Sequence, residues 1–432
     1  MYRNRMKSFT WGFVILTLLI FSGACSNSSL PEVQQTVVPE QHIQPSPTPF
    51  QPQPGVFDEP FVNGLPSLEL SISPTPLPTI RVEGIYPTPI TDSPTLVGNS
   101  PTFLVTRIDP LTGLPPADPA LLERRPIAVK ITNYPRYVRP QSGLTRADVV
   151  YEYYIEGGLT RFIAVFYGND VESAGPVRSG RYFDAHITRM YHAFYVFKYA
   201  DPREYTYFKN SDLVDFLVVP GYGACPPFFV GKKSVDTYNN IFFNTTKFRD
   251  CISRRDVDNS RPPIRSGFFY DLPLESDQAG ELVYIRYSVD DYFYWEYNLD
   301  TNRYVRYQEK DSTRDGKRES YKLLTDALTG EPVGADNIIV LFVPHTFANI
   351  YEKEDEVYHI DLVDSGPAFV FLKGIFREGM WRRTNVDQPL LITDTIGSPI
   401  PLRPGITFYE VMGMSSKYWQ DGDDWHFQFK TP

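Results

Sequence analysis

The 432-residue chain has only six histidines and three cysteines, and it lacks the motifs of several common catalytic sites. It contains no His-Glu-x-x-His, no Gly-x-Ser-x-Gly and no Ser-x-x-Lys. His186 and His192 are six residues apart, which separates them by about 120° around a helix. Asp300-x-Asn302 lacks the glycine and the final glutamate of a calcium loop. The sequence therefore predicts no metal and no cofactor, and it leaves the presence of an enzyme activity uncertain, with the balance against one.

Positive charge is also scarce, because the formal net charge is −10. Nucleic-acid-binding proteins usually present a basic face, so we expect no nucleic-acid partner. Aromatic residues, by contrast, make up 15% of the chain, which suits β-rich domains.

The chain has no long apolar run, and its most apolar stretch, Trp11 to Phe21, is about half as long as a membrane-spanning helix. Basic residues precede this stretch, and Ser22-Gly-Ala24 leads directly into Cys25. This pattern predicts a lipoprotein-type signal peptide over 1–24, with Cys25 lipidated, for example with palmitate. Ordinary cleavage and an uncleaved anchor are the alternatives. We expect an extracytoplasmic protein anchored by lipid to the bacterial cell membrane, so that the bilayer is one partner.

The predicted location bears on how the other two cysteines are interpreted. If Cys25 carries lipid, Cys225 and Cys251 remain as a pair in an oxidising compartment. They are either a disulfide or two unrelated buried thiols.

Residues 25–102 are rich in proline, in phrases such as QPSPTPFQPQP, which predicts a disordered tether. The tether is interpreted as a spacer, with a proline-motif ligand as the alternative.

The rest of the chain is predicted to be α+β, in two domains. The first, 103–266, has a mixed sheet with helices packed on it. Its strands are expected at Ile127–Ile131, Val149–Ile155, Phe162–Tyr167 and Phe194–Tyr199, with a turn at Glu156-Gly-Gly158 and a helix over 181–193 capped by Ser179 or Gly180. The second, 267–432, is predicted to be mostly antiparallel β, with strands at Tyr292–Leu299, Tyr304–Tyr307, Ile338–Val343, Val357–Leu362, Ala368–Leu372 and Phe408–Met412 and a turn at Asp364-Ser-Gly366.

Polar loops of the first domain contain the candidate binding site. Arginine presents a planar fork that suits carboxylate or phosphate, and a helix beginning after Ser179 would add free N–H groups. If the loops converge, they form an anion site. The alternative is structural, with Glu156 and Arg161 paired across their hairpin and Arg178 bracing backbone carbonyls. The candidate ligand-binding residues are Arg139, Gln141, Ser142, Glu156, Arg161, Arg178, Ser179 and Arg181.

The second domain offers an aromatic alternative. Tyr284, Tyr292 and Tyr294 form either an exposed platform for sugars or a partner, or cross-strand pairs that stabilise a sheet.

In these loops and strands the chain resembles the YerB-like family of bacterial lipoproteins, which has two successive domains of unknown function. The matching features are Arg139-Pro-Gln-Ser-Gly-Leu144, Ala147-Asp148, Glu156-Gly-Gly158 with Thr160-Arg161, Gly175-Pro-Val-Arg-Ser179 with Arg181, Tyr304-Val-Arg306, Asn337-Ile-Ile-Val340 and Gly379-Met-Trp381-Arg382.

The chain departs from the family in two places. Family members often carry a histidine and a Gly-Gly-Ser run where this chain has Lys198-Tyr-Ala-Asp201. They also tend to have Pro-His-Asn-hydrophobic-Tyr where this chain has Tyr238-Asn-Asn-Ile-Phe242. Both histidines are absent, which weakens catalysis more than binding.

Three functions follow as hypotheses. The first is a membrane-tethered protein that binds an anionic cell-envelope component, such as a cell-wall polymer, or an envelope protein. The second is an enzyme acting on cell-wall glycan or peptide, with Glu152, Glu156 or Asp184 as catalytic acid or base. The third is a structural or assembly factor of an envelope complex.

Overall fold

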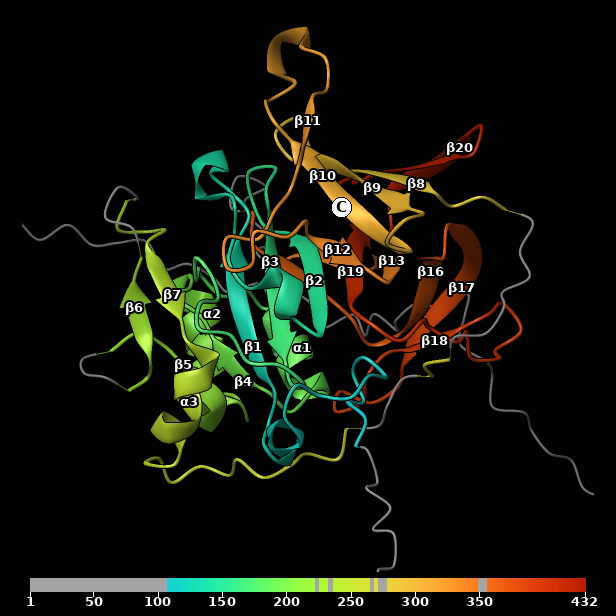
Figure 1. The fold of residues 1–432 in the computed structure, drawn as a ribbon. Helices are drawn as coiled ribbons and strands as arrows, with labels where there is room; N and C mark the ends of the chain where they lie inside the picture. The colour runs from blue at the N-terminus through green and yellow to red at the C-terminus, as the bar shows by residue number, and fades with distance from the viewer. Residues whose placement is uncertain (1–106, 222–224, 232–235, 265–267, 271–277, 349–355) are drawn as a thin grey trace, which may run out of the picture. The chain divides into compact units, whose positions relative to one another are not determined.

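A computed structural model describes residues 107–221, 225–231, 236–264, 268–270, 278–348 and 356–432 (Figure 1). The predicted signal peptide, Cys25 and the predicted tether lie outside these residues. No helix in the described ranges is long and apolar enough to cross a membrane.

The described chain is built around a ten-stranded mixed sheet, which confirms the predicted α+β class. Its strand order is β18-β17-β16-β13-β19-β2-β3-β1-β4-β5. The strands are β1 (Ile127–Thr132), β2 (Val149–Tyr154), β3 (Thr160–Phe166), β4 (Phe194–Val196), β5 (Leu217–Val218), β13 (Asn337–Val343), β16 (Asp364–Leu372), β17 (Ile375–Arg383), β18 (Leu391–Thr393) and β19 (Thr407–Gly413).

This sheet crosses the predicted domain boundary at 266/267. β19 pairs in parallel with β2, with Thr407 opposite Val149 and Glu410 opposite Glu152. The described residues accordingly belong to one compact unit, in which both halves of the chain contribute strands to one sheet.

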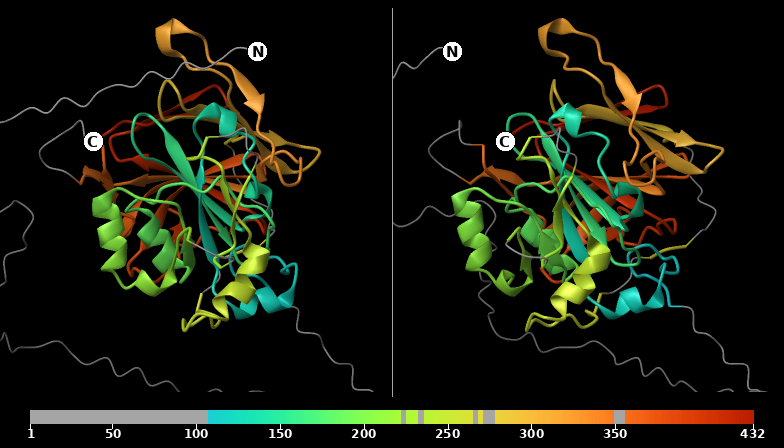
Figure 2. Two further views of the ribbon diagram at one scale, coloured as in Figure 1. Left: turned by 90° about the vertical axis from the view of Figure 1, so that its left-hand side faces the viewer. Right: turned by 60° about the vertical axis from the view of Figure 1, so that its left-hand side comes forward.

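A seven-stranded sheet from the second half packs on the ten-stranded one. The ring of Trp295 lies 4.8 Å from that of Phe408, and the ring of Trp425 lies 3.9 Å from that of Phe376. The strands are β8 (Leu282–Arg286), β9 (Tyr292–Asn298), β10 (Arg303–Glu309), β11 (Tyr321–Leu323), β12 (Gly334–Ala335), β20 (Lys417–Asp421) and β21 (Asp424–Gln428). The segment between β10 and β11 projects away from both sheets (Figure 2).

Short helices and hairpins complete the described structure. Asp201 accepts a hydrogen bond from Arg203 N and Pro202 follows it, so the sequence starts α2 at that point. The helices are α1 (Asp184–Met190), α2 (Pro202–Lys209) and α3 (Thr245–Ile252), with short 3-10 turns η1 (Pro119–Glu123), η2 (Arg136–Val138), η3 (Leu144–Arg146), η4 (Val214–Phe216) and η5 (Arg314–Gly316). The hairpins are β6 (Phe228–Val230) with β7 (Ile241–Phe243), and β14 (His345–Phe347) with β15 (Tyr358–Ile360).

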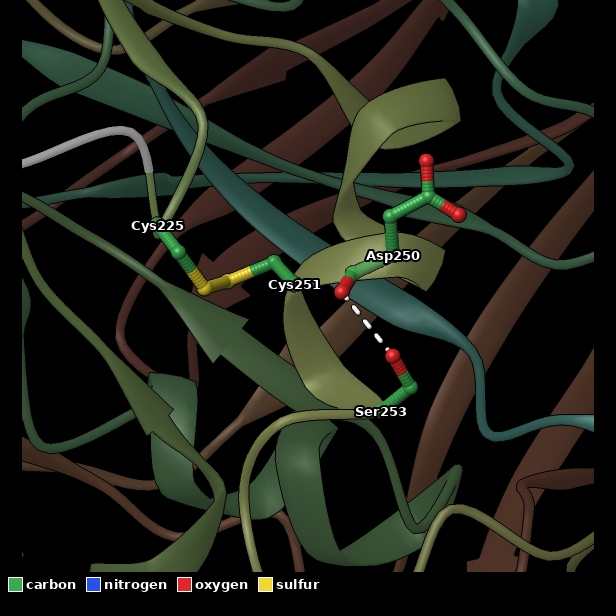
Figure 3. Close-up of a disulfide and its surroundings, with 4 residues drawn as sticks. All are labelled: Cys225, Asp250, Cys251 and Ser253. Carbon is green, nitrogen blue, oxygen red and sulfur yellow. Dashed lines mark hydrogen bonds between the residues drawn. A yellow bond between two sulfur atoms is a disulfide. The ribbon is translucent and has the colours of Figure 1, made fainter.

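Cys225 and Cys251 form a disulfide that ties α3 to the segment before β6 (Figure 3). Their Cα atoms are 5.2 Å apart. Beside the bridge, the Ser253 hydroxyl donates to the carbonyl of Asp250 at 2.9 Å, which closes the end of the helix.

Two local predictions are wrong. The helix predicted over 181–193 begins only at Asp184, and Phe183 rather than Ser179 or Gly180 precedes it. The reason is that Gly180 pairs with Ala200 in an extended bridge. Asp364 to Gly366 is not a turn but the start of β16. The β16–β17 turn lies instead at Lys373 and Gly374, which have positive φ.

Candidate functional site

Four of the predicted binding residues converge beside the β2–β3 hairpin. Glu156 lies in its turn, where Gly157 and Gly158 have φ values of 65° and 79°, and Arg161 lies on β3. Arg178 and Arg181 belong to an extended segment between β3 and α1. That segment runs beside Lys198 to Ala200, because Lys198 N donates to Arg178 O and Gly180 N donates to Tyr199 O.

Glu156 holds two of these arginines. The Arg181 Nε donates to its Oε2 at 2.9 Å, and Arg161 Nη2 lies 3.7 Å from its Oε1. Burial opposes ionisation of Glu156, but Arg181 and then Arg161 outweigh burial and lower its pKa. The predicted Glu156–Arg161 pair across the hairpin is therefore present, with Arg181 as the stronger partner.

Several cationic side chains surround the Glu156 carboxylate. Burial lowers the pKa of Arg161 to about 9, and the nearby Arg181 and Arg178 act in the same direction. Burial likewise lowers the pKa of Lys198, and Arg178 lowers it further. Glu204 supplies a second carboxyl 3.6 Å from Arg181, but burial raises its pKa to about 7. At neutral pH positive charge exceeds negative charge in this cluster.

Arg178 differs from the other arginines of the cluster. Within the described ranges, no carboxylate lies within 4.0 Å of its guanidinium, and its buried Nε has no hydrogen-bond partner. Its guanidinium carbon lies 5.8 Å from the centroid of the Tyr238 ring. Burial lowers the pKa of Arg178 and Arg181 lowers it further. The predicted bracing of backbone carbonyls by its side chain is not among the described hydrogen bonds.

Ser179 contributes its backbone to the cluster. Its carbonyl accepts a hydrogen bond from Arg161 Nη1 at 2.8 Å. The predicted support from a helix N-terminus is wrong, because α1 begins five residues later and is only seven residues long.

Arg139, Gln141 and Ser142 lie elsewhere, in the contact between the two halves of the chain. Arg139 Nη2 is 2.8 Å from Glu309 Oε1, and its side chain is almost completely buried. Gln141 Nε2 donates to Asn133 Oδ1 at 3.0 Å, and the Ser142 hydroxyl donates to Ser173 O at 2.8 Å. Within the described ranges, no hydrogen bond or ion pair joins these three residues to the arginine cluster.

The catalytic candidates are paired. Glu152 Oε2 lies 2.6 Å from Arg306 Nη1, with both side chains fully buried. Asp184 is fully buried too, and its Oδ1 accepts hydrogen bonds from Lys130 Nζ at 3.0 Å and Tyr153 OH at 2.5 Å. Because Glu156 is bound by arginines, none of the three carboxyls is a free acid or base at the surface.

Sequence reasoning missed Lys130, Lys198, Glu204 and Tyr238 as parts of this region. The sequence does indicate a buried partner for Lys130, because a lysine within the apolar run of β1 needs one. Burial lowers its pKa to about 7, although Asp184 opposes that change. Within the described ranges, no group of three or more His, Cys, Asp or Glu side chains is arranged to hold a metal ion.

The predicted sugar platform on the second sheet is mostly ring-on-ring packing. Tyr292 is buried. The ring of Tyr294 stacks on that of Tyr307 at 4.8 Å and 7°, and the ring of Tyr284 stacks on that of His426 at 4.8 Å and 8°. Neighbouring rings cover one another's faces, so cross-strand stabilisation describes these residues better than a platform.

Comparisons with known proteins agree with this architecture. Residues 111–258 match the family model "Protein of unknown function (DUF3048) N-terminal domain", and residues 283–409 match "Protein of unknown function (DUF3048) C-terminal domain". The chain belongs to the YerB-like family. A relative from Bacillus subtilis, "Putative lipoprotein YerB", is 28% identical over 321 residues, which cover 70% of this chain and 85% of the relative.

The family fold is shared as well. The crystal structure of the YerB protein from Bacillus subtilis has a TM-score of 0.59 to this chain at 23% identity, covering 71% of this chain and 96% of the other. Membership of the YerB-like family thus assigns this chain to a group whose domains are of unknown function and whose relative is named as a lipoprotein.

Proposed function

We propose that this YerB-like protein is a lipid-anchored, extracytoplasmic binding protein that holds an anionic component of the cell envelope at Arg178. The observation that carries the proposal is the environment of the Arg178 side chain. This side chain is partly buried, it has no carboxylate partner in the described part of the chain, and it lies beside Arg181 and Lys198.

Cationic side chains placed close together repel one another, which destabilises the fold unless negative charge lies nearby. Like charges in a partly buried place disfavour one another's ionisation, and groups with such perturbed pKa values gather at functional sites. A phosphate or carboxylate bound at Arg178 would supply the missing negative charge and would accept paired hydrogen bonds from the guanidinium fork.

The anchor and tether fit a ligand outside the cytoplasm. Cys25 as the lipidated residue would attach the chain to the bilayer, and a single acyl chain gives only weak membrane binding, so a lipoprotein needs more than one. The proline-rich residues 25–102 would then act as a spacer between the membrane and the binding unit. A relative named as a lipoprotein supports this arrangement.

The test is co-sedimentation of the purified chain with bacterial cell walls before and after acid extraction of their anionic polymers. We expect intact walls to bind the wild-type chain and extracted walls to bind it at least tenfold less. Arg178→Ala should reduce binding to intact walls, whereas Arg189→Ala, which removes an arginine of α1 that is paired with Asp212, should not. Equal binding to intact and extracted walls would refute the proposal.

The enzyme hypothesis is weakened by the pairing of Glu152, Glu156 and Asp184 with cationic side chains. An acid or base that is also fully buried, as Glu152 and Asp184 are, has no access to a substrate. The assembly-factor hypothesis stays a prediction.

A further inference from the structure

Tyr199 has an unusual backbone conformation next to the arginine cluster. Its φ is 63°, in the left-handed region that glycine adopts freely and bulky residues rarely adopt. The residue is 62% exposed, so burial of the ring cannot account for this conformation. Strained backbone of this kind persists where the surrounding structure holds it, often at binding sites.

The exposed ring of Tyr199 lines a cavity of about 480 Å³. This volume lies in the usual range for small-molecule sites. Two tyrosines and two prolines form much of the wall, which gives flat apolar surfaces with hydroxyl groups at their edges. The lining residues are Tyr199, Ala200, Pro202, Tyr205, Val219 and Pro220.

The cavity adjoins the proposed anion site through backbone pairing. Gly180 pairs with Ala200 in parallel, and Gly180 N donates to Tyr199 O at 3.0 Å. Paired segments lie roughly 5 Å apart, so the segment from Arg178 to Arg181 borders the residues that form the cavity wall. The Lys198 ammonium lies 5.2 Å from the centroid of the Tyr199 ring.

We propose that Tyr199 and this cavity bind a sugar ring of an anionic glycan whose charged group is held by the arginines of the Arg178–Arg181 segment. The inference rests on the proposed function and names its ligand class. The electron-rich face of a tyrosine attracts the polarised C–H groups of a pyranose, and the sugar hydroxyls can bond to the phenol and to backbone groups. An apolar chain would gain nothing from the adjoining cations.

The experiment is calorimetric titration of the full-length chain in detergent with three probes: inorganic phosphate, glucose 1-phosphate and glucose. Glucose 1-phosphate should bind about tenfold more tightly than inorganic phosphate, a difference equivalent to about 1.4 kcal/mol. Tyr199→Ala should remove that preference and leave the affinity for inorganic phosphate unchanged. Tyr199→Phe keeps the ring face and should keep most of the preference, losing only what the phenol hydroxyl adds.

A control and a second variant make the result specific. Tyr207→Ala removes a tyrosine of α2 that is 37% exposed and bonded to Arg189 but does not line the cavity, and it should bind as wild type. Tyr199→Gly should lose the preference while raising the free energy of unfolding, because glycine relieves the strained φ.

The two proposals fail differently. If the wild-type chain binds phosphate without preferring glucose 1-phosphate, or if Tyr199→Ala keeps the preference, the sugar site is wrong and the anion site stands. If the wild-type chain binds neither phosphate nor glucose 1-phosphate, the anion site is wrong and the sugar site falls with it.

Discussion

At the scale of single residues, Asp291 is the buried group that most clearly couples stability to pH. It is fully buried, and its Oδ2 accepts hydrogen bonds from the amide and hydroxyl of Thr160. Burial, together with the nearby Glu309 and Glu152, raises its pKa to about 8, although Arg139 opposes that change. Asp291 therefore stays protonated in the fold at pH 7.

The sign of the pH dependence follows from this shift. The unfolded chain releases the Asp291 proton near pH 3.8 and the folded chain near pH 8. The stability that protonated Asp291 contributes to the fold is therefore complete below pH 3.8. It then falls as pH rises and is lost above pH 8. Asp291→Asn removes this titration. We expect the wild-type chain to lose stability relative to Asp291→Asn between pH 5 and pH 9, measured by urea unfolding. A constant difference across that range would contradict the assignment.

Arg306 gives a second prediction at this scale, because its guanidinium is shared by two buried carboxylates. Its Nη1 lies 2.6 Å from Glu152 and 3.4 Å from Glu410. Arg306→Met would leave both acids unpaired and should lower the free energy of unfolding by about 3–5 kcal/mol. Adding Glu152→Gln and Glu410→Gln to Arg306→Met should restore much of that loss, and no restoration would argue against the pairing.

These residues show which parts of the site the sequence could predict. Glu156 and Arg161 are five positions apart across one turn, so local sequence was enough to pair them. Arg139 bonds to Glu309, which is 170 positions away, and nothing in a local pattern identifies that partner. Arg139 was therefore grouped with the binding arginines, although the structure places it in the contact between the halves.

At the scale of secondary structure elements, the long apolar patterns predict strands of the large sheet, whereas short runs predict little. The strand predicted at Phe162–Tyr167 is present as β3, which is buried along its whole length and lies between β2 and β1. The β6–β7 hairpin and α3 were missed, because their few-residue runs give little periodicity. The start of α1 was misplaced since Ser179 and Gly180 are good capping residues, but tertiary pairing of Gly180 with Ala200 overrides that preference.

The disulfide between Cys225 and Cys251 should stabilise the element it anchors. It closes 26 residues, for which the chain-entropy model gives about 3.5 kcal/mol at 25 °C. Replacing both cysteines with serine should lower the free energy of unfolding by about that amount, measured with guanidinium. A change below about 1 kcal/mol would show that the bridge adds little to the loop's own packing.

At the scale of the whole molecule, the shared ten-stranded sheet decides how the protein unfolds. β2 of the first half pairs with β19 of the second, and Glu152, Arg306 and Glu410 form one ion network across them. Unfolding either half alone would break this ion network and leave its remaining charged side chains unpaired. We therefore expect a single calorimetric transition in which the calorimetric and van't Hoff enthalpies agree. Two resolved transitions would indicate separate domains, as the boundary at 266/267 predicts.

The central claim is that Arg178 binds an anion, and thermal unfolding in phosphate tests it most directly. Ionic strength is held constant with chloride while inorganic phosphate is raised, and a specific ligand then raises Tm with the logarithm of its concentration. The account predicts that phosphate raises the Tm of the wild-type and Arg189→Ala chains and leaves the Tm of Arg178→Ala unchanged. An equal rise in Arg178→Ala, or no rise in the wild-type chain, would contradict it.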